Sequence, residues 1–195
     1  MKKDVIRLSI KLGILFLTLT TIFCVTYYEN AELAKELLEP YIESLSGMVE
    51  DDGTIGFIPL WLNNLFVCVK TIGMGLAPIL YLPVIVLFSN ATLIGTVLGL
   101  TSAETGYSLM NVVLYSILPH GIFEIPALCV SFGLGFYLCR FMTRRFFRKG
   151  DGRSLLEVLN AVAKGFVLVV IPLLTIAAFV ECYVTPEIMT WAGMM

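Results

Sequence analysis

The sequence predicts an all-α, polytopic membrane protein with about five membrane-spanning helices, one of them broken. The first reason is composition: 58% of the 195 residues are apolar and 14% are charged, whereas a soluble domain carries about 25% charged residues. The second reason is that several apolar stretches reach roughly 20 residues, the length that crosses a bilayer. The third is that basic and acidic residues gather in separate segments. Residues 1–195 are therefore assigned to one membrane domain.

The first span is predicted at residues 8–28. Its apolar run follows four basic residues, Lys2, Lys3, Arg7 and Lys11. A basic start before an apolar run also begins secretory signals, but Thr26-Tyr27-Tyr28 follows here in place of a small-residue cleavage site. We therefore expect this segment to be retained as a transmembrane helix.

An external acidic segment is predicted next, at residues 29–52, because it carries eight acidic residues and one basic residue, Lys35. Residues 30–48 have the pattern of an amphipathic helix that Pro40 kinks or splits. Its apolar stripe is formed by Leu33, Leu37, Leu38, Tyr41, Ile42 and Leu45. The helix is either a cap over the outer ends of the bundle or a docking surface for an external partner.

Four further spans are predicted at residues 57–75, 78–100, 107–141 and 158–184. A second basic cluster lies between the last two: Arg140, Arg144, Arg145, Arg148, Lys149 and Arg153. Basic loops stay in the cytoplasm, so residues 140–153 and the basic start of the chain are both expected inside. Five crossings then place the N-terminus inside and the C-terminus outside.

The span at residues 107–141 is too long to cross once as a regular helix. Pro119 and Gly121 stand near its middle and Pro126 follows, and a proline removes a hydrogen bond from the helix. The sequence therefore predicts half-helices at 107–118 and 120–141, broken at Pro119-His120-Gly121. An outer half that re-enters the membrane is the alternative.

Small residues recur at four-residue spacing in two spans, which lets helix backbones approach closely in lipid. The two sets are Ala91, Gly95 and Gly99, and Ala127, Ser131 and Gly135. They indicate packing within the chain or across a homodimer. The five cysteines lie in apolar segments without metal-type spacing, so we expect them to be packing residues.

The candidate site consists of His120, Glu124 and Glu181, which all lie in apolar surroundings. Such groups are costly in hydrocarbon unless each has a partner, so they mark a functional site. Three interpretations fit: the groups bond to one another, they bind a divalent metal, or they relay protons or substrate. Among metals, zinc suits one nitrogen and two carboxylate ligands.

A straight span would place His120 near mid-membrane and Glu181 nearer the outer surface, at 1.5 Å of rise per residue. The two therefore meet only if the outer half-helix is tilted or re-entrant. A second set of residues is predicted to form an intramembrane polar network: Asn63, Asn64, Lys70 and Asn111.

Residues 118–127 (LPHGIFEIPA) resemble the signature of the stage II sporulation protein M family of bacterial and archaeal membrane proteins. Weaker similarities are Asn63-Asn64, Asn90 with Gly95, and AFVE at 178–181 with Thr185-Pro186. The resemblance covers roughly residues 61–186. It implies an all-helical polytopic protein with a functional His and Glu in the motif. The sporulation member is similar in role to a scaffold that anchors a cell-wall-degrading complex.

We therefore expect a non-enzymatic, multi-pass protein of the prokaryotic cytoplasmic membrane that acts as a scaffold or regulator in the cell envelope. No residue is assigned a catalytic role. The expected partners are the lipid bilayer and envelope or cell-wall-remodelling proteins, not nucleic acid. One alternative is a transporter or channel with Glu124, Glu181 and Lys70 along a polar path. The other is an intramembrane metal-dependent hydrolase, which lacks an obvious general base.

Overall fold

The computed structural model describes residues 2–46, 56–149 and 152–194, with the backbone alone for residues 42–46. Within these ranges every regular element is a helix. Five helical segments are long and apolar enough to span a membrane: Lys2–Glu29, Phe57–Met74, Pro83–Thr105, Leu109–Phe146 and Leu155–Trp191. The predicted all-α class with five spans is confirmed.

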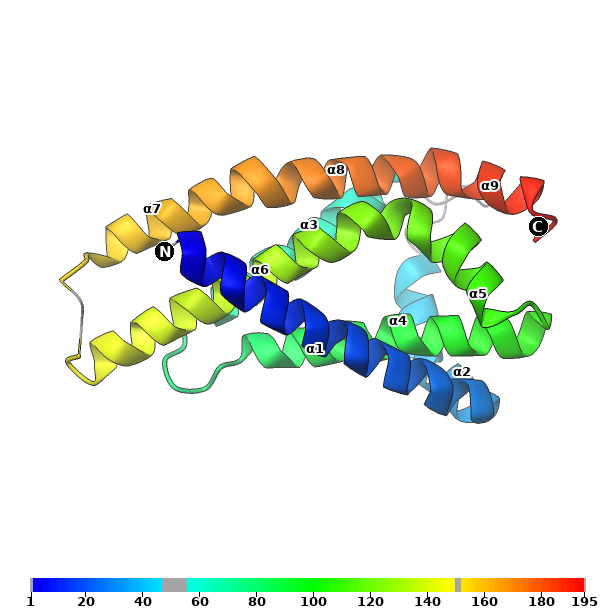
Figure 1. Ribbon diagram of the computed structural model, residues 1–195, viewed down its shortest axis with the longest axis horizontal. Coiled ribbons are helices and arrows are strands. Elements are labelled where there is room, and N and C mark those ends of the chain that lie inside the picture. Colours follow the sequence, from blue (N-terminus) through cyan, green and yellow to red (C-terminus); the bar gives the residue numbers. More distant parts are fainter. Residues whose placement is uncertain (1, 47–55, 150–151, 195) are drawn as a thin grey trace.

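The spans form an elongated bundle in which the chain runs back and forth along the long axis (Figure 1). The first three are α1 (Lys2–Glu29), α3 (Phe57–Met74) and α4 (Pro83–Thr105). The fourth consists of α5 (Leu109–Val112), the π-helix η1 (Val113–Ile117) and α6 (Leu118–Phe146). The fifth consists of α7 (Leu155–Gly165), η2 (Phe166–Val170), α8 (Ile171–Phe179), η3 (Val180–Val184) and α9 (Thr185–Trp191).

The start of α1 and the connection from α6 to α7 lie at the same end of the bundle, and α2 (Ala31–Ser46) lies towards the other (Figure 1). This arrangement is compatible with two basic regions on one side of a membrane. The N-in, C-out orientation itself stays a prediction. Residues 150 and 151 of the predicted cytoplasmic loop, and residues 47–52 of the predicted acidic segment, lie outside the described residues.

Each of the three π-helices ends two residues before a proline. The residue before Pro119, Pro172 or Pro186 donates its backbone N–H to the carbonyl five positions back, from Leu118 to Val113, Ile171 to Phe166 and Thr185 to Val180. A proline lacks an N–H and its ring collides with the carbonyl four residues back. A wider turn with i→i+5 bonds accommodates that collision without ending the helix.

The break in the fourth span therefore lies in η1, immediately before Pro119, where the chain changes direction between α5 and α6 (Figure 1). The prediction that Gly121 and Pro126 also break the helix is wrong, since both lie inside the regular helix α6. A membrane helix tolerates an internal proline where neighbouring groups compensate for the lost bond.

The start of the third span also differs from the prediction. The third span begins at Pro83 and not at residue 78, because residues 75–82 form a loop in which Ile79 and Tyr81 adopt positive φ angles of 73° and 46°. The Ile79 N–H donates to Thr143 Oγ1 on α6 at 2.8 Å, which fixes this loop against the bundle.

The small residues pack helices together inside the chain. A Cβ added at Gly99 would lie 2.5 Å from the Cys24 carbonyl oxygen of α1, and one added at Gly135 would lie 2.7 Å from the Thr71 carbonyl oxygen of α3. Ala91, Ala127 and all their counterparts are buried. The structure thus uses both sets for packing within the chain, and a homodimer, which stays a prediction, would need other faces.

The main core surrounds α6, which contacts α1, α3 and α8. Its largest fully buried side chains include Phe16 and Phe132, whose ring centroids lie 5.8 Å apart. All five cysteines are free thiols, and Cys24, Cys68 and Cys139 are buried among apolar side chains.

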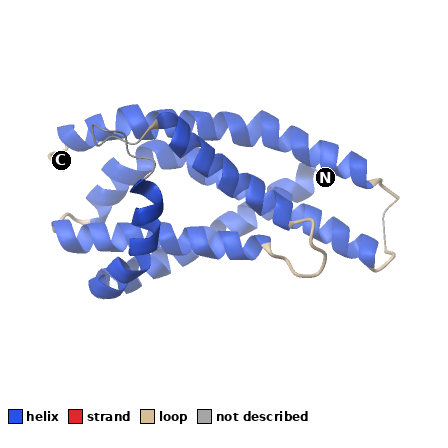
Figure 2. Cartoon of the chain, turned by 180° about the vertical axis from the view of Figure 1, so that it is seen from behind, coloured by secondary structure: helices blue, strands red, loops and turns tan. Residues whose placement is uncertain are grey.

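Helix α2 lies across the bundle, as the two opposite views show (Figures 1 and 2). Pro40 lies inside it and does not split it. Its inward side chains are Ala34 and Leu38, which pack with Tyr27 and Leu100. Leu33 and Leu37, both placed on the predicted apolar stripe, are about half exposed instead, because the face that docks is turned towards Ala34.

Candidate metal centre

The candidate site lies where the start of α6 meets the last span. His120 is in the first turn of α6 and Glu124 follows one turn later, so both project from the same helix face. Glu181 comes from the π-helix η3 of the last span, which contacts α6. One ligand atom from each of the three residues lies within 4.8 Å of the other two. The predicted convergence of an imidazole and two carboxylates is thus present in the fold.

The bend before Pro119 makes this meeting possible. α5 and η1 are inclined to α6, so the start of α6 lies at the apex of the bend, against the last span (Figure 1). His120 and Glu181 were expected to meet only if the outer half of the fourth span is tilted, and the structure has this tilt. The π-helix η3 also helps to bring the residues together, because a π turn rotates the residues that follow it relative to an uninterrupted helix. π turns are frequent at functional sites.

The cluster is largely buried. His120 is 7% exposed, and its side chain and that of Glu124 are 9% and 19% exposed. Two carboxylates held close together away from water repel each other unless a proton or a cation lies between them. A site of this kind therefore attracts positive charge.

The distance between His120 and Glu124 argues against a direct bond between these two side chains. His120 Nε2 and Glu124 Oε2 lie 4.0 Å apart, beyond the roughly 2.7–3.2 Å of an N–H···O hydrogen bond. Ligands of a tetrahedral zinc ion, each about 2.0–2.2 Å from the metal, lie about 3.4 Å from one another. His120 and Glu124 are thus too far apart for a direct hydrogen bond, and the three ligand atoms, which all lie within 4.8 Å of one another, are near enough to draw together around one ion.

Thr185 lies beside Nδ1 of the imidazole, the ring nitrogen that is not directed at Glu124. Its buried Oγ1 lies 3.4 Å from His120 Nδ1. With the proton on Nδ1, the imidazole donates to the threonine hydroxyl, and the lone pair of Nε2 faces the carboxylates. Histidine ligands of metals are commonly oriented in this way through the ring nitrogen that does not bind the metal.

Tyr41 lies on helix α2, outside the five spans, and is partly buried. Burial, followed by the negative charges of Glu124 and Glu181, raises the pKa of the Tyr41 phenol above its usual value. α2 therefore brings an aromatic hydroxyl from outside the transmembrane spans towards the two carboxylates.

The residues predicted as a polar network lie elsewhere. Asn63 and Asn64 are half-buried on α3, Lys70 is exposed near the end of that helix, and Asn111 is exposed on α5. In the described residues no hydrogen bond joins these four side chains. The network stays a prediction, and the transporter alternative gains no supporting arrangement from it.

Sequence reasoning did not assign Tyr41 or Thr185 to the site. Thr185 could have been found, since it lies four residues after Glu181 and directly before a proline. Tyr41 could not, because its position depends on how a helix outside the spans packs onto the bundle.

A family model described as stage II sporulation protein M matches residues 12–186, which include His120, Glu124 and Glu181. The chain belongs to the stage II sporulation protein M family. The predicted resemblance is thereby confirmed over most of the chain.

Two proteins from Methanocaldococcus jannaschii are similar to this chain. The uncharacterized protein MJ0706 is 29% identical over 156 residues, which cover 77% of this chain and 65% of the relative. The uncharacterized protein MJ0793 is 40% identical over 75 residues, which cover 38% of this chain and 42% of the relative. The chain thus spans less than two thirds of the length of either relative. No solved structure matches it.

Proposed function

We propose that this member of the stage II sporulation protein M family is a non-enzymatic scaffold or regulator in the prokaryotic cytoplasmic membrane, stabilised by a divalent metal, zinc, on His120, Glu124 and Glu181. The observation that carries the proposal is the convergence of these three ligands, from two spans, to within 4.8 Å. The ion would join the start of α6 to the last span.

Three features support a metal over mutual bonding. The closest separation between the imidazole and Glu124 exceeds a hydrogen bond. The paired carboxylates need positive charge between them. Thr185 lies at Nδ1 of the imidazole, which directs Nε2 to the ligand position.

A structural role for the ion suits the surroundings better than a catalytic role. Three protein ligands leave the fourth position of a zinc ion open, as in catalytic zinc sites, whereas structural sites are closed by four. The structural role therefore rests on the residues around the ion. In the described part of the chain, the cluster contains no acid or histidine besides its three ligands that could act as a general base. A fixed junction between two spans is what a scaffold requires.

Elemental analysis of the protein purified in detergent tests the metal. We expect about one zinc ion per chain in the wild type, and its loss in His120→Ala, Glu124→Gln and Glu181→Gln. The matched control is Glu187→Gln, which removes an exposed acid six residues further along the same span. Equal zinc contents in all variants, or none in the wild type, would contradict the proposal.

The scaffold role is tested by photo-crosslinking in cells from position 37, where the leucine side chain of α2 is 48% exposed. We expect a specific cross-linked envelope protein. Position 34 is the control, since Ala34 is fully buried against the bundle and cannot contact a partner. The same products from both positions, or none from position 37, would count against a docking role for α2.

A further inference from the structure

The end of α6 carries a dense group of basic side chains. Arg144 and Arg145 lie in the last turn of the helix, and Arg148 and Lys149 follow it directly. All four side chains are exposed. We call residues 144–149 the basic tip. Exposed positive charge gathered in so short a segment attracts anions to that end of the bundle.

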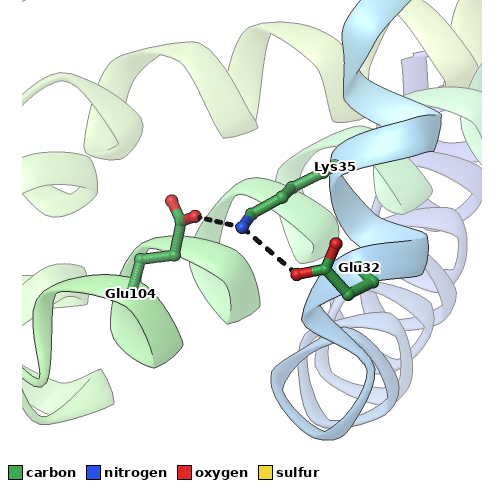
Figure 3. Close-up of polar contacts among 3 residues, drawn as sticks. All are labelled: Glu32, Lys35 and Glu104. Carbon is green, nitrogen blue, oxygen red and sulfur yellow. Dashed lines mark hydrogen bonds and ion pairs between the residues drawn. The ribbon is translucent and has the colours of Figure 1, made fainter.

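The tip differs from Lys35, which lies on α2 towards the other end of the bundle. Lys35 Nζ lies 3.0 Å from Glu104 Oε1 at the end of α4 and 3.3 Å from Glu32 Oε1 on α2 itself (Figure 3). Among the residues that the structure describes, the basic side chains of the tip have no such carboxylate partner. The charge of Lys35 is thus balanced within the chain, and that of the tip is directed at the surroundings.

The tip lies where two membrane spans end. The fourth span ends at Phe146 and the fifth begins at Leu155. Both views show the end of α6 and the start of α7 reaching beyond the start of α1 and the loop between α3 and α4 (Figures 1 and 2). In that loop Leu80 is 65% exposed, as expected of a side chain that faces lipid. The tip, further out along the same axis, then lies at the level of the headgroups, which border the hydrocarbon on each side.

Two aromatic rings stand among the charges of the tip. Phe146 and Phe147 are 62% and 56% exposed, and their ring centroids lie 5.3 Å apart. Basic side chains with exposed phenylalanines among them are typical of segments that lie in the membrane interface, where the rings enter the boundary between headgroups and acyl chains. An acidic soluble partner would match the charges alone. A lipid surface matches both the charges and the rings.

Arg148 occupies a backbone position that favours glycine. Its φ is 54°, and the backbone N–H groups of Arg148 and Lys149 donate to the carbonyls of Arg145 and Arg144 at 3.1 and 2.8 Å. These two bonds end a helix with one left-handed residue, which is usually glycine because a Cβ is unfavourable there. An arginine at this position indicates that its guanidinium has a use beyond ending the helix.

We propose that the basic tip binds the phosphate groups of anionic phospholipids. Arg144, Arg145 and Arg148 supply guanidinium groups, which match phosphate with parallel N–H···O bonds. Groups of about four to eight basic residues next to a transmembrane helix are typical of anionic-lipid recognition. Bound lipid would hold the end of α6, the helix that the main core surrounds, at the membrane surface. The tip includes no residue of the candidate metal centre, so this inference is independent of the proposed metal.

Native mass spectrometry of the full chain in a non-ionic detergent tests the proposal. The probes are phosphatidylglycerol and phosphatidylcholine with the same acyl chains, and we expect the wild type to bind phosphatidylglycerol more tightly. Arg148→Gly removes the guanidinium and also relieves the positive φ. It should weaken phosphatidylglycerol binding by about 5-fold, the effect of one basic residue near an anionic lipid surface. Phosphatidylcholine binding should not change.

Three controls accompany this variant. Lys35→Gln also removes one positive charge, but towards the other end of the bundle, and should leave the lipid preference unchanged. Thermal unfolding of Arg148→Gly without added lipid should occur at or above the temperature of the wild type, since glycine suits the left-handed position. Inorganic phosphate at the concentration of the lipid should not displace phosphatidylglycerol.

A wild type without a preference for phosphatidylglycerol overturns the proposal, and so does an Arg148→Gly variant that keeps the full preference. An equal loss in Lys35→Gln would assign the preference to net charge and not to the tip. Displacement by inorganic phosphate would make the tip a site for a free anion, which also contradicts lipid binding.

Discussion

Replacing Thr185 by valine tests whether the imidazole is oriented from behind. Valine keeps nearly the same volume and puts a methyl group where the hydroxyl lies. The Thr185 hydroxyl is buried and lies 3.4 Å from His120 Nδ1, longer than an ideal hydrogen bond. The variant leaves Nδ1 without this partner, so the ring loses its fixed orientation towards Glu124.

The magnitude follows from that distance. Loss of an outer-shell partner weakens metal binding by about 10–100-fold. A long hydrogen bond belongs at the lower limit, so we expect about a 10-fold loss of Zn²⁺ affinity, or about 1.4 kcal/mol. Competition with a chelating dye in detergent measures it, and Thr185→Ser should restore most of the affinity.

Thr190→Val is the matched control. Thr190 is exposed on α9 and its hydroxyl donates to the Pro186 carbonyl of its own helix at 2.9 Å, so its loss should not affect the site. If Thr185→Val binds Zn²⁺ as tightly as Thr190→Val, the orienting role of Thr185 is refuted. Failure of serine to restore binding would instead assign the effect to packing.

Three further substitutions test the fold that positions the site. Gly99→Ala should destabilise the bundle by about 1–3 kcal/mol in detergent unfolding, the usual cost of overpacking; its Cβ would lie 2.5 Å from the Cys24 carbonyl oxygen, whereas Gly73→Ala meets nothing within 4 Å and should not destabilise. Phe132→Ala should cost about 3–5 kcal/mol because the ring is fully buried, whereas Phe66→Ala, at a 66% exposed position, should cost little. Pro186→Ala should weaken Zn²⁺ binding, since η3 can then relax to an α-helix and turn Glu181 away by up to about 100°; unchanged binding would contradict this role for the proline.

The number of spans could be predicted from sequence because each depends on a local property, apolar length. The bend before Pro119 could be predicted for the same reason, since proline chemistry acts within one turn. The start of α4 was harder to predict from the sequence, because Pro78 and Pro83 are both plausible first-turn residues. The loop between them is fixed by a contact with Thr143 on a helix distant in sequence.

The docking face of α2 shows a different limit. Leu33, Leu37 and Leu38 all count as apolar in a periodicity argument, yet the bundle buries Leu38 together with the small Ala34 and leaves the other two exposed. Close approach to Tyr27 and Leu100 favours a small side chain at the centre of that contact. Periodicity identifies a stripe, but the shape of the surface that receives it decides which edge of the stripe is buried.

Two of the three prolines with π turns flank the candidate site, and this links the fold to its chemistry. Pro119 widens the helix before His120, and Pro186 widens the helix that carries Glu181. In an uninterrupted helix, a residue added or removed turns everything beyond it by about 100°. Each π turn therefore sets the rotation of one ligand-bearing segment relative to the rest of its span. A metal site built from two such segments depends on both prolines, although neither supplies a ligand atom.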